Sequence, residues 1–585
     1  MKKTNSSIQK DVPKNKALRD FLSKKIPTWT FPLSIGIAAT LLFLGIFGQG
    51  LDGPLFPWIP GDPGDGALNN WLLERNFQLF KGHQGWLSVD TIFKADAFWP
   101  EKNTLAWSDN WLILTPFYAI LRTITTPGQA FTGLIGLCLT ANFLACYRLA
   151  RHGSYLIVYR LIAAFISSFS LTIFAQLGHA QLVPAFAGVM AIDSLAAFFH
   201  NDSDDSNKHE ALIYNEDFLK STAWMLLQLA IGFYQGFFFA IAWASIFLIA
   251  VTDKKNQSTL RTHLKSFRLL NAKRLRIAII NALLLLINIL IYWQYFIFSR
   301  EAGPRPWSEV SSMIPKVWSY FYNWISTPGN VSFPAPVQFI NQQTYQGPIW
   351  EHAMFPGYSF YFLLALSLLL WNKVSHDSQL GLIGKSCLFL MIISIGIGGQ
   401  DHLITAWKLV YKLPGFSALR AVSRIGMPLV LMATPILSAG LQKLESRLPK
   451  KEMMTLLVSI TVLYMLGNIV TPRLNNFSAI EYEKHVDEFG SKIEKIIEQR
   501  NCSSFFVAAS SSSMDDLLKS QILAMWSSLR TKIPTISGYS GHQPSGSWSA
   551  TMNETTMNLW LIQKGVSVQE VKQACWIDGS DILKS

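Results

Sequence analysis

Residues 277–298 read I-A-I-I-N-A-L-L-L-L-I-N-I-L-I-Y-W-Q-Y-F-I-F, an apolar run without one charged side chain. A helix needs about 20 apolar residues to cross the hydrocarbon of a bilayer, so this stretch predicts a transmembrane helix. Hydrocarbon forces the backbone to pair its own polar groups, which favours a helix here. Lys273, Arg274 and Arg276 stand directly before the run, and such residues mark the cytoplasmic end of a span.

The composition of the whole chain agrees with this local pattern. The 585 residues are 50% hydrophobic and only 15% charged, against about 25% charged in soluble domains. The short alternating segments of a membrane strand barrel are absent from the sequence. The formal charge of +13 does not indicate nucleic-acid binding, because the Lys and Arg residues cluster between apolar blocks.

Apolar blocks like 277–298 recur along the chain, and we predict an α-helical integral membrane protein with about eleven spans. They lie at about 31–50, 129–149, 155–176, 180–199, two short spans in 223–251 split at 232–236, 277–298, one ending before 373, 386–397, one ending before 443, and 453–470. The segment 111–124 is too short to span and is predicted as interfacial or re-entrant. The acidic segment 201–220 is predicted to be cytoplasmic.

The loop charges divide the chain into three regions. Residues 1–30 form a basic cytoplasmic N-terminus, and residues 31–470 form the membrane domain with outer loops 51–128 and 299–352. The block Phe31–Phe47 lacks a small-residue cleavage site, so we expect an uncleaved first span. Residues 471–585 are polar and long enough for a small α/β domain, which the positive-inside pattern places outside.

Two of the five cysteines, Cys502 and Cys575, lie in this tail, whereas the others fall in apolar spans. A pair of cysteines in an oxidising compartment is expected to form a disulfide. Two unrelated buried thiols are the alternative.

The candidate chemistry lies in the predicted outer loops. Asp62 and Asp65 stand on a turn rich in glycine and proline, Gly61–Gly66. Two close carboxylates can act as a general base or as metal ligands, and their repulsion raises one pKa. An ordinary surface turn has the same composition.

Other polar residues stand at the same predicted outer face and are candidates for substrate contacts, with solvated turns or helix ends as the alternative. They are Glu101, Asp109, His179, Gln181, Glu351 and His352.

The loop after 386–397 carries Lys408, Lys412, Arg420 and Arg424, although short outer loops are usually poor in basic residues. An anion at the membrane surface would explain four positive charges, and Arg matches phosphate oxygens well. The alternative is that this loop is cytoplasmic. The sequence has no Walker-type loop, no CxxC pair and no HExxH motif, and no internal repeat is obvious.

Taken together, these motifs resemble the GT-C superfamily of membrane glycosyltransferases, near the bacterial protein mannosyltransferase and arabinosyltransferase relatives. The motifs are Gly61-Asp62-Pro63-Gly64-Asp65, Phe98-Trp99-Pro100-Glu101, Ala106-Trp107-Ser108-Asp109, Gly178-His179, Glu351-His352 with Pro356-Gly357, Leu413-Pro414-Gly415-Phe416-Ser417-Ala418-Leu419-Arg420, and Ser423-Arg424. They cover the membrane region, and the tail from residue 471 resembles no catalytic module.

The resemblance implies an inverting glycosyltransferase in the bacterial cytoplasmic (inner) membrane. Its donor would be a sugar on a polyprenyl phosphate or diphosphate, and its acceptor a glycan, lipid or protein. Asp65 or Asp62 would deprotonate the acceptor, while Arg420 and Arg424 hold the phosphate. Glu351 and His179 would line the pocket, and some relatives use a divalent cation such as Mg or Mn.

Two other functions stay open at the level of sequence. A transporter or flippase of glycans or lipid-linked sugars would use charged groups near the bilayer midplane and broken helices, for which Asp193 and the split at Gly232 are candidates. A non-catalytic envelope assembly protein would use its exported tail to bind a partner.

Overall fold

The computed structural model describes residues 29–44, 56–82, 89–199, 208–252, 257, 272–322, 347–371, 378–399, 402–468, 476–511 and 513–583. Most of the predicted basic N-terminus, and parts of both predicted outer loops, lie outside these residues.

The membrane region is built almost entirely of helices, among which η denotes a 3-10 helix. Its first part contains α2 (Thr30–Phe43), β1 (Trp58–Pro60), α3 (Asp65–Lys81), α4 (Val89–Phe93), η2 (Thr104–Trp107), α5 (Thr115–Arg122), α6 (Pro127–Leu149), η3 (Ala150–His152), α7 (Ile157–Ser168), α8 (Leu171–Ala175), η4 (Leu177–Leu182), α9 (Phe186–Phe198), α10 (Lys208–Ile231), α11 (Phe233–Thr252) and α13 (Ala272–Ala302). Its second part contains α14 (Trp307–Ser312), η5 (Val317–Phe321), η6 (Ile349–His352), α15 (Tyr358–Leu369), α17 (Ser378–Ser394), α18 (Trp407–Val410), η7 (Phe416–Ala418), η8 (Val422–Ile425), α19 (Gly426–Met432), α20 (Thr434–Glu445) and α21 (Lys450–Asn468).

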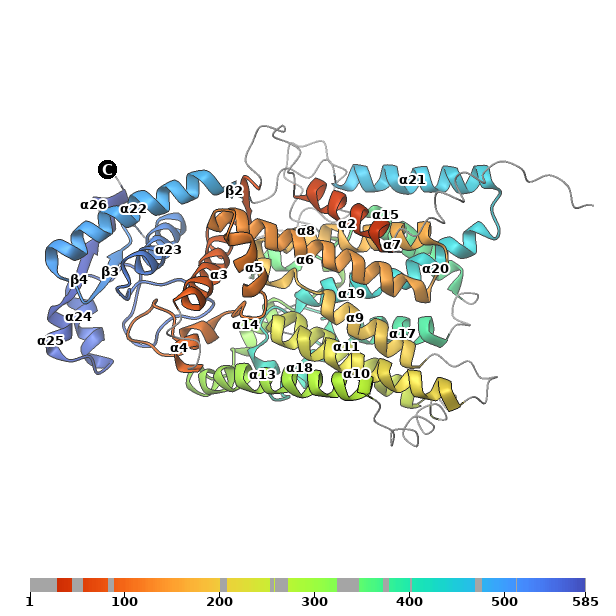
Figure 1. The fold of residues 1–585 in the computed structure, drawn as a ribbon, viewed down its shortest axis with the longest axis horizontal. Coiled ribbons are helices and arrows are strands. Elements are labelled where there is room, and N and C mark those ends of the chain that lie inside the picture. The colour runs from red at the N-terminus through yellow and green to blue at the C-terminus, as the bar shows by residue number, and fades with distance from the viewer. Residues whose placement is uncertain are drawn as a thin grey trace, which may run out of the picture.

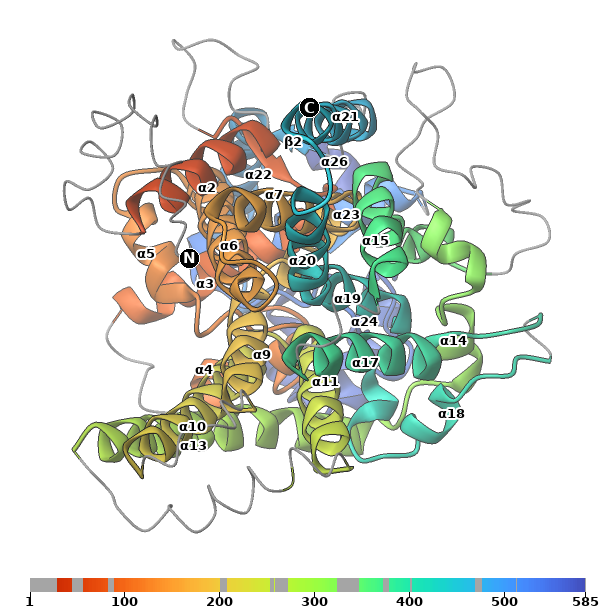
Figure 2. The same cartoon turned by 90° about the vertical axis from the view of Figure 1, so that its right-hand side faces the viewer.

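Five helical segments are long and apolar enough to cross a membrane, and four further apolar helices of 10–17 residues accompany them in the described residues. The five are Pro127–His152, Ile157–Ala175, Phe233–Thr252, Ala272–Ala302 and Val422–Glu445. Figure 1 shows the long helices running side by side along the molecule, and Figure 2 views this bundle end-on, with α10 beside α13 at one edge. The protein is therefore a helical membrane protein, and a total of about eleven spans stays a prediction.

The helix is interrupted between α10, which ends at Ile231, and α11, which begins at Phe233, within the predicted split. The break frees the backbone N–H of Phe233, which donates to the Asp109 carboxylate at 2.9 Å. Helix α10 already begins at Lys208, within the acidic segment that is predicted to be cytoplasmic. Glu216 there pairs with Lys273 of α13 at 2.7 Å, so a polar helix extension is stabilised by a neighbouring helix.

The segment 111–124 forms only the eight-residue helix α5. At 1.5 Å per residue it is about 12 Å long, far below the thickness of a bilayer. Phe117, Ile120 and Ile124 are 53%, 67% and 81% exposed, so one apolar face of this segment is left uncovered by protein.

The C-terminal region is a small mixed α/β unit at one end of the molecule (Figure 1). It contains β2 (Asn476–Ser478), α22 (Ala479–Arg500), β3 (Ser504–Ala508), α23 (Met514–Thr531), α24 (Glu554–Gln563), α25 (Val568–Lys572), β4 (Ala574–Asp578) and α26 (Gly579–Leu583). Strands β3 and β4 pair in parallel. Cys502 and Cys575 are joined by a disulfide with their Cα atoms 5.7 Å apart.

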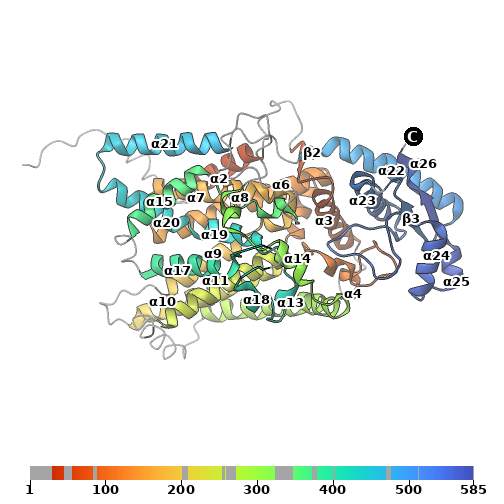
Figure 3. The same cartoon turned by 180° about the vertical axis from the view of Figure 1, so that it is seen from behind.

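The C-terminal region packs against the first loop. Strand β2 pairs antiparallel with β1, which precedes α3. The indole of Trp71 on α3 donates to the carbonyl of Met525 on α23 at 2.8 Å, and both residues are buried. Seen from behind in Figure 3, α3 stands between the membrane helices and α23. Helix α3 therefore carries residues that face both parts of the molecule.

Candidate functional site

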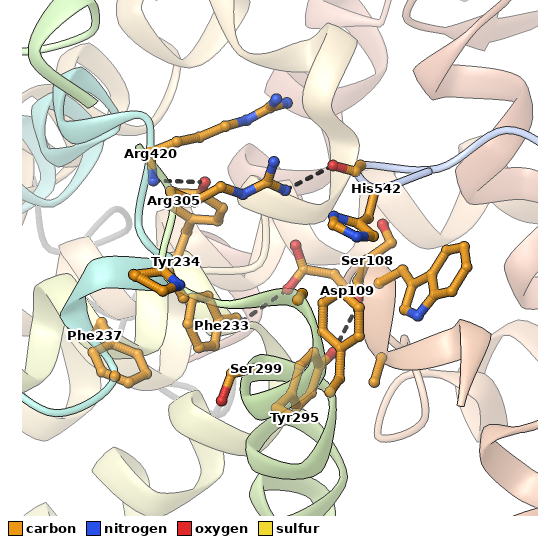
Figure 4. A pocket seen from close by; sticks show the side chains of 18 of the residues that line it. Ser108, Asp109, Phe233, Tyr234, Phe237, Tyr295, Ser299, Arg305, Arg420 and His542 are labelled. Atoms are coloured by element: carbon orange, nitrogen blue, oxygen red, sulfur yellow. Dashed lines mark hydrogen bonds between the residues drawn. The ribbon is translucent and has the colours of Figure 1, made fainter. Parts of the chain in front are cut away.

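A cavity of about 640 Å³ lies where α3, α11 and α13 meet the loop after α18. Aromatic side chains of α11 and α13 form one wall, among them Phe233, Phe237 and Tyr292. Asp65 lines the remainder, together with Asp109, Arg305 and Arg420, which Figure 4 shows. The cavity is thus apolar toward the membrane helices and charged toward the loops.

A continuous chain of ionised side chains reaches the cavity from four separate segments. Arg424 binds Glu351 through two hydrogen bonds, of 2.7 Å from Nη2 and 3.1 Å from Nε. Glu351 also contacts His179 Nε2 at 3.3 Å. His179 Nδ1 in turn lies 2.6 Å from Asp65 Oδ2. Arg424 and Glu351 are each 3% exposed, so neither charge is balanced by solvent.

The protonation states of these four linked side chains follow from the charges of their neighbours. Burial and the charge of Arg424 oppose protonation of His179, yet Asp65 and Glu351 raise the pKa of His179 to about 9. Burial would raise the pKa of Asp65, but His179 and Tyr539 lower it below the usual value. Against burial, Arg424 and His179 hold the pKa of Glu351 well below its ordinary range. At neutral pH all four groups are charged, with opposite signs adjacent.

Asp62 has a different environment, although it lies in the same turn. Its Oδ1 accepts the backbone N–H groups of Gly64 and Asp65, each at 2.8 Å. Burial and then the negative charge of Asp65 raise the pKa of Asp62. Its carboxylate therefore shapes the start of α3, and the cavity itself is lined by Asp65.

Asp109 is the second carboxylate that lines the cavity. It is 9% exposed, and its Oδ1 accepts the N–H of Phe233 at the break between α10 and α11. Burial raises the pKa of Asp109 to about 6. A carboxyl group that titrates this close to neutrality is suited to proton transfer.

Arg420 and Arg305 supply positive charge at the cavity (Figure 4). Both approach the single carboxylate of Glu309, at 3.4 Å for Arg420 and 3.8 Å for Arg305. Arg424 lies over the ring of Tyr234, 4.7 Å from its centroid, and its charge is matched by Glu351. One positive charge of the Arg420 and Arg305 pair is therefore left without a carboxylate among these contacts.

The C-terminal region contributes two side chains that the sequence did not single out. The hydroxyl of Tyr539 donates to Asp65 Oδ1 at 2.9 Å. The ring of His542 packs edge-on against Trp107 and Phe298, with centroid distances of 5.5 and 5.0 Å. Both lie in the stretch Gly-Tyr-Ser-Gly-His, residues 538–542, in the tail after the last predicted span.

The other candidates from the sequence lie apart from the charged chain or support it. Gln181 accepts from Asn69 at 2.9 Å and lines the cavity. His352 points elsewhere, bonding Ser319 Oγ at 2.8 Å and the Ser312 carbonyl at 2.9 Å. Glu101 pairs with Lys564 at 2.5 Å, and Lys412 is exposed.

As they are hydrogen-bonded here, Asp65 and Glu351 do not present a site for the divalent cation that the resemblance allows. Both oxygens of Asp65 accept hydrogen bonds, from His179 and Tyr539. Both oxygens of Glu351 face the Arg424 guanidinium. The described part of the chain also groups no three His, Cys, Asp or Glu side chains as metal ligands.

Comparison with known proteins returned structural similarities only. No family model matches the chain. No curated protein matches it either. The apo oligosaccharyltransferase of Archaeoglobus fulgidus superposes with a TM-score of 0.46 at 11% identity, over 88% of this chain and 65% of that one. The oligosaccharyltransferase AglB of that archaeon, in complex with an inhibitory peptide and a dolichol-phosphate, gives 0.47 at 12% identity, over 87% and 64%. The Archaeoglobus fulgidus oligosaccharyltransferase in complex with Zn and sulfate gives 0.41 at 12% identity, over 87% of this chain and 62% of that one. The chain thus spans slightly less than two thirds of these proteins.

Proposed function

We propose that this protein is a GT-C-type glycosyltransferase, which moves a sugar from a polyprenyl-phosphate-linked donor to an acceptor hydroxyl at the outer face of the membrane, with inversion. One observation carries the proposal: two carboxylates in different protonation environments line a cavity with an apolar aromatic wall and an uncompensated arginine charge. A lipid-linked sugar has the matching parts, namely an apolar chain, a phosphate and a reacting sugar.

The leaving phosphate would be held by Arg420, with Arg305 nearby. As the bond between the anomeric carbon and the phosphate oxygen breaks, both bonding electrons remain on the phosphate. The guanidinium of Arg420 shares Glu309 with Arg305, so it has charge available for that anion. An arginine also matches the geometry of phosphate oxygens.

The acceptor proton would pass to Asp109. The acceptor oxygen attacks the anomeric carbon on the face opposite the phosphate, and its O–H bond breaks toward the Asp109 carboxylate. A pKa of about 6 keeps Asp109 ionised at neutral pH while making it a better base than an ordinary aspartate.

Asp65 would then have a different task from the one expected from its sequence motif. Its lowered pKa and its two hydrogen-bond donors make it a poor proton acceptor. A carboxylate that stays ionised stabilises the positive charge that develops at the anomeric carbon. The two carboxylates thus divide the work, as two groups with separated pKa values do.

The decisive experiment measures transfer of label from total polyprenyl-linked sugars to envelope acceptors by the purified protein. Arg420→Ala is expected to lower the rate about a hundredfold to a thousandfold, because a charged donor to the leaving group is lost. Lys412→Ala is the control, since it removes a positive charge from an exposed position of the same loop. Well-folded wild-type protein that transfers no label, or an Arg420→Ala variant as active as wild type, would falsify the proposal.

Tyr539→Phe tests whether the C-terminal region belongs to the site. Loss of a hydrogen bond to a charged group corresponds to about 1.5–3 kcal/mol, so we expect transfer to fall about tenfold or more. Tyr464→Phe is the matched control, because its buried hydroxyl donates to the Phe169 carbonyl far from the cavity. Equal rates for Tyr539→Phe and wild type would show that this contact is only structural.

The alternative of a transporter gains no support from Asp193. Its carboxylate is fully buried and binds Arg148 at 2.8 Å and Arg151 at 3.0 Å. His152 adds a third contact at 3.0 Å. These contacts join α6, η3 and α9, so Asp193 has a structural explanation.

A further inference from the structure

A second cavity, of about 720 Å³, lies on the other side of α3. Asp65 and Asn69 on α3 line the first cavity, whereas Asn70, Glu74 and Gln78 line the second. At 3.6 residues per turn, positions four apart share a face, and positions five apart point in roughly opposite directions. Helix α3 is therefore a wall between two cavities, about one helix diameter or 10–12 Å thick.

The second cavity is bounded by α3, the turn between α5 and α6, and helices α22 and α23. Tyr482 of α22 and Trp526 of α23 supply aromatic groups. Helices α22 and α23 belong to the C-terminal region, whereas α3 and α5 belong to the first predicted outer loop, residues 51–128. Figure 3 shows α3 beside α23. The cavity exists only because the two regions pack together.

Asn70 is the most informative group in this cavity. It is completely buried, yet neither its amide nitrogen nor its amide oxygen has a hydrogen-bond partner among the described residues. Tyr482 and Trp526 line the same cavity, and neither the Tyr482 hydroxyl nor the Trp526 indole nitrogen has a hydrogen-bond partner among the described residues. An unpaired buried amide is costly, so such groups usually serve a ligand or an ordered water.

The charged groups that line the cavity are paired within the protein. Arg122 binds Glu74 at 3.0 Å, and Arg530 binds Glu494 at 2.9 Å, with Asp487 at 3.8 Å. Glu483 accepts the backbone N–H of Gly128 at 2.8 Å. No lining arginine is therefore left for a phosphate, which makes an anionic ligand unfavourable. What remains available is the amide of Asn70 and the aromatic groups of Tyr482 and Trp526.

We propose that this second cavity binds a neutral oligosaccharide. Sugar rings have apolar C–H faces, which pack on Tyr and Trp, and hydroxyls, which pair with amides and carboxylates. The identity of the oligosaccharide rests on the proposed function: it would be the part of the donor or acceptor glycan that lies remote from the reacting sugar. Binding energy gained at such a remote site helps to position the reacting groups.

Direct binding, measured apart from turnover, tests this site. The purified full-length protein is applied to an array of neutral, phosphorylated and carboxylated oligosaccharides, and the neutral ones retained are titrated. Asn70→Leu and Tyr482→Phe are each expected to weaken their binding at least about tenfold, which corresponds to 1.4 kcal/mol. Glu488→Gln, an exposed change on α22 outside the cavity, should bind like wild type.

A thermal melt of Asn70→Leu separates ligand binding from a structural role. Replacing an unpaired buried amide by an apolar side chain of similar size is expected to keep or raise the melting temperature. Loss of binding in a protein of equal or higher stability therefore supports the site. Asp65→Asn should bind the oligosaccharide normally even if it transfers nothing, so failure of the proposed function is distinguishable.

Three results would overturn the inference. They are retention of no neutral oligosaccharide by wild-type protein, a preference for phosphorylated or carboxylated sugars, and wild-type affinity in both Asn70→Leu and Tyr482→Phe. The last result would show that any sugar bound lies outside this cavity.

Discussion

Asp109→Asn is expected to lower kcat for sugar transfer by about 10²- to 10⁴-fold, the usual contribution of a positioned general base. The amide keeps the size of the side chain and can still accept from the Phe233 N–H, so the break between α10 and α11 should persist. Because the acceptor is still bound but no longer deprotonated, KM should change much less than kcat.

The pH profile gives the same assignment a second test. The pKa of Asp109 is raised to about 6 by burial, so the wild-type rate should fall as the pH drops through about 6 and the carboxylate is protonated. That acid limb should disappear in Asp109→Asn, whose remaining rate no longer depends on this group. Asp90→Asn, which changes an exposed carboxylate of the same loop, should retain both the rate and the limb.

A different result would reassign the base. If Asp109→Asn retained full activity while Asp65→Asn lost it, the proton would pass to Asp65 despite its hydrogen bonds to His179 and Tyr539. The motif Gly61-Asp62-Pro63-Gly64-Asp65 would then have identified the base correctly. Asp109 would have a structural role, accepting the Phe233 N–H where the helix is interrupted.

The members of the charged chain could be found in the sequence because charges near apolar segments are costly and therefore conspicuous. Asp65, His179, Glu351 and Arg424 all stood out in this way. Their pairing could not be predicted, since it depends on how α3, η4, η6 and η8 pack. His352 shows the limit: it follows Glu351 directly, yet consecutive residues of a helical turn point in different directions, and its ring binds Ser319 instead.

Two kinds of feature had no signal in the sequence. Tyr539 and Asn70 are ordinary residue types, and they gain significance only because the C-terminal region packs on α3. The first half of α10 is polar, and hydropathy identifies spans but not a helix that continues beyond them. In contrast, the long apolar run 277–298 lies within α13, because its length and composition leave the backbone no other way to pair in hydrocarbon.

Glu351→Gln is expected to lower the stability of the folded protein by about 3–5 kcal/mol, the usual effect of breaking a buried ion pair. The amide would leave the Arg424 guanidinium, which is 3% exposed, beside protonated His179 without a balancing anion. The measurement is thermal unfolding in detergent, with Glu309→Gln as the matched control. Glu309 is 27% exposed and lies 3.4 Å from Arg420 and 3.8 Å from Arg305. Replacing it should therefore lower the stability much less.

The pH dependence of unfolding tests whether Glu351 keeps His179 protonated. Asp65 and Glu351 raise the pKa of His179 from 6.5 to about 9. A group whose pKa is raised on folding adds stability that is complete below its unfolded pKa and disappears as the pH passes its folded pKa. The wild-type melting temperature should therefore fall between pH 6.5 and 9, whereas Glu351→Gln, in which the pKa of His179 is lower, should lose most of this slope. An unchanged slope in the variant would mean that Asp65 alone keeps His179 protonated. The four charged groups would then act as two independent pairs, Arg424 with Glu351 and His179 with Asp65.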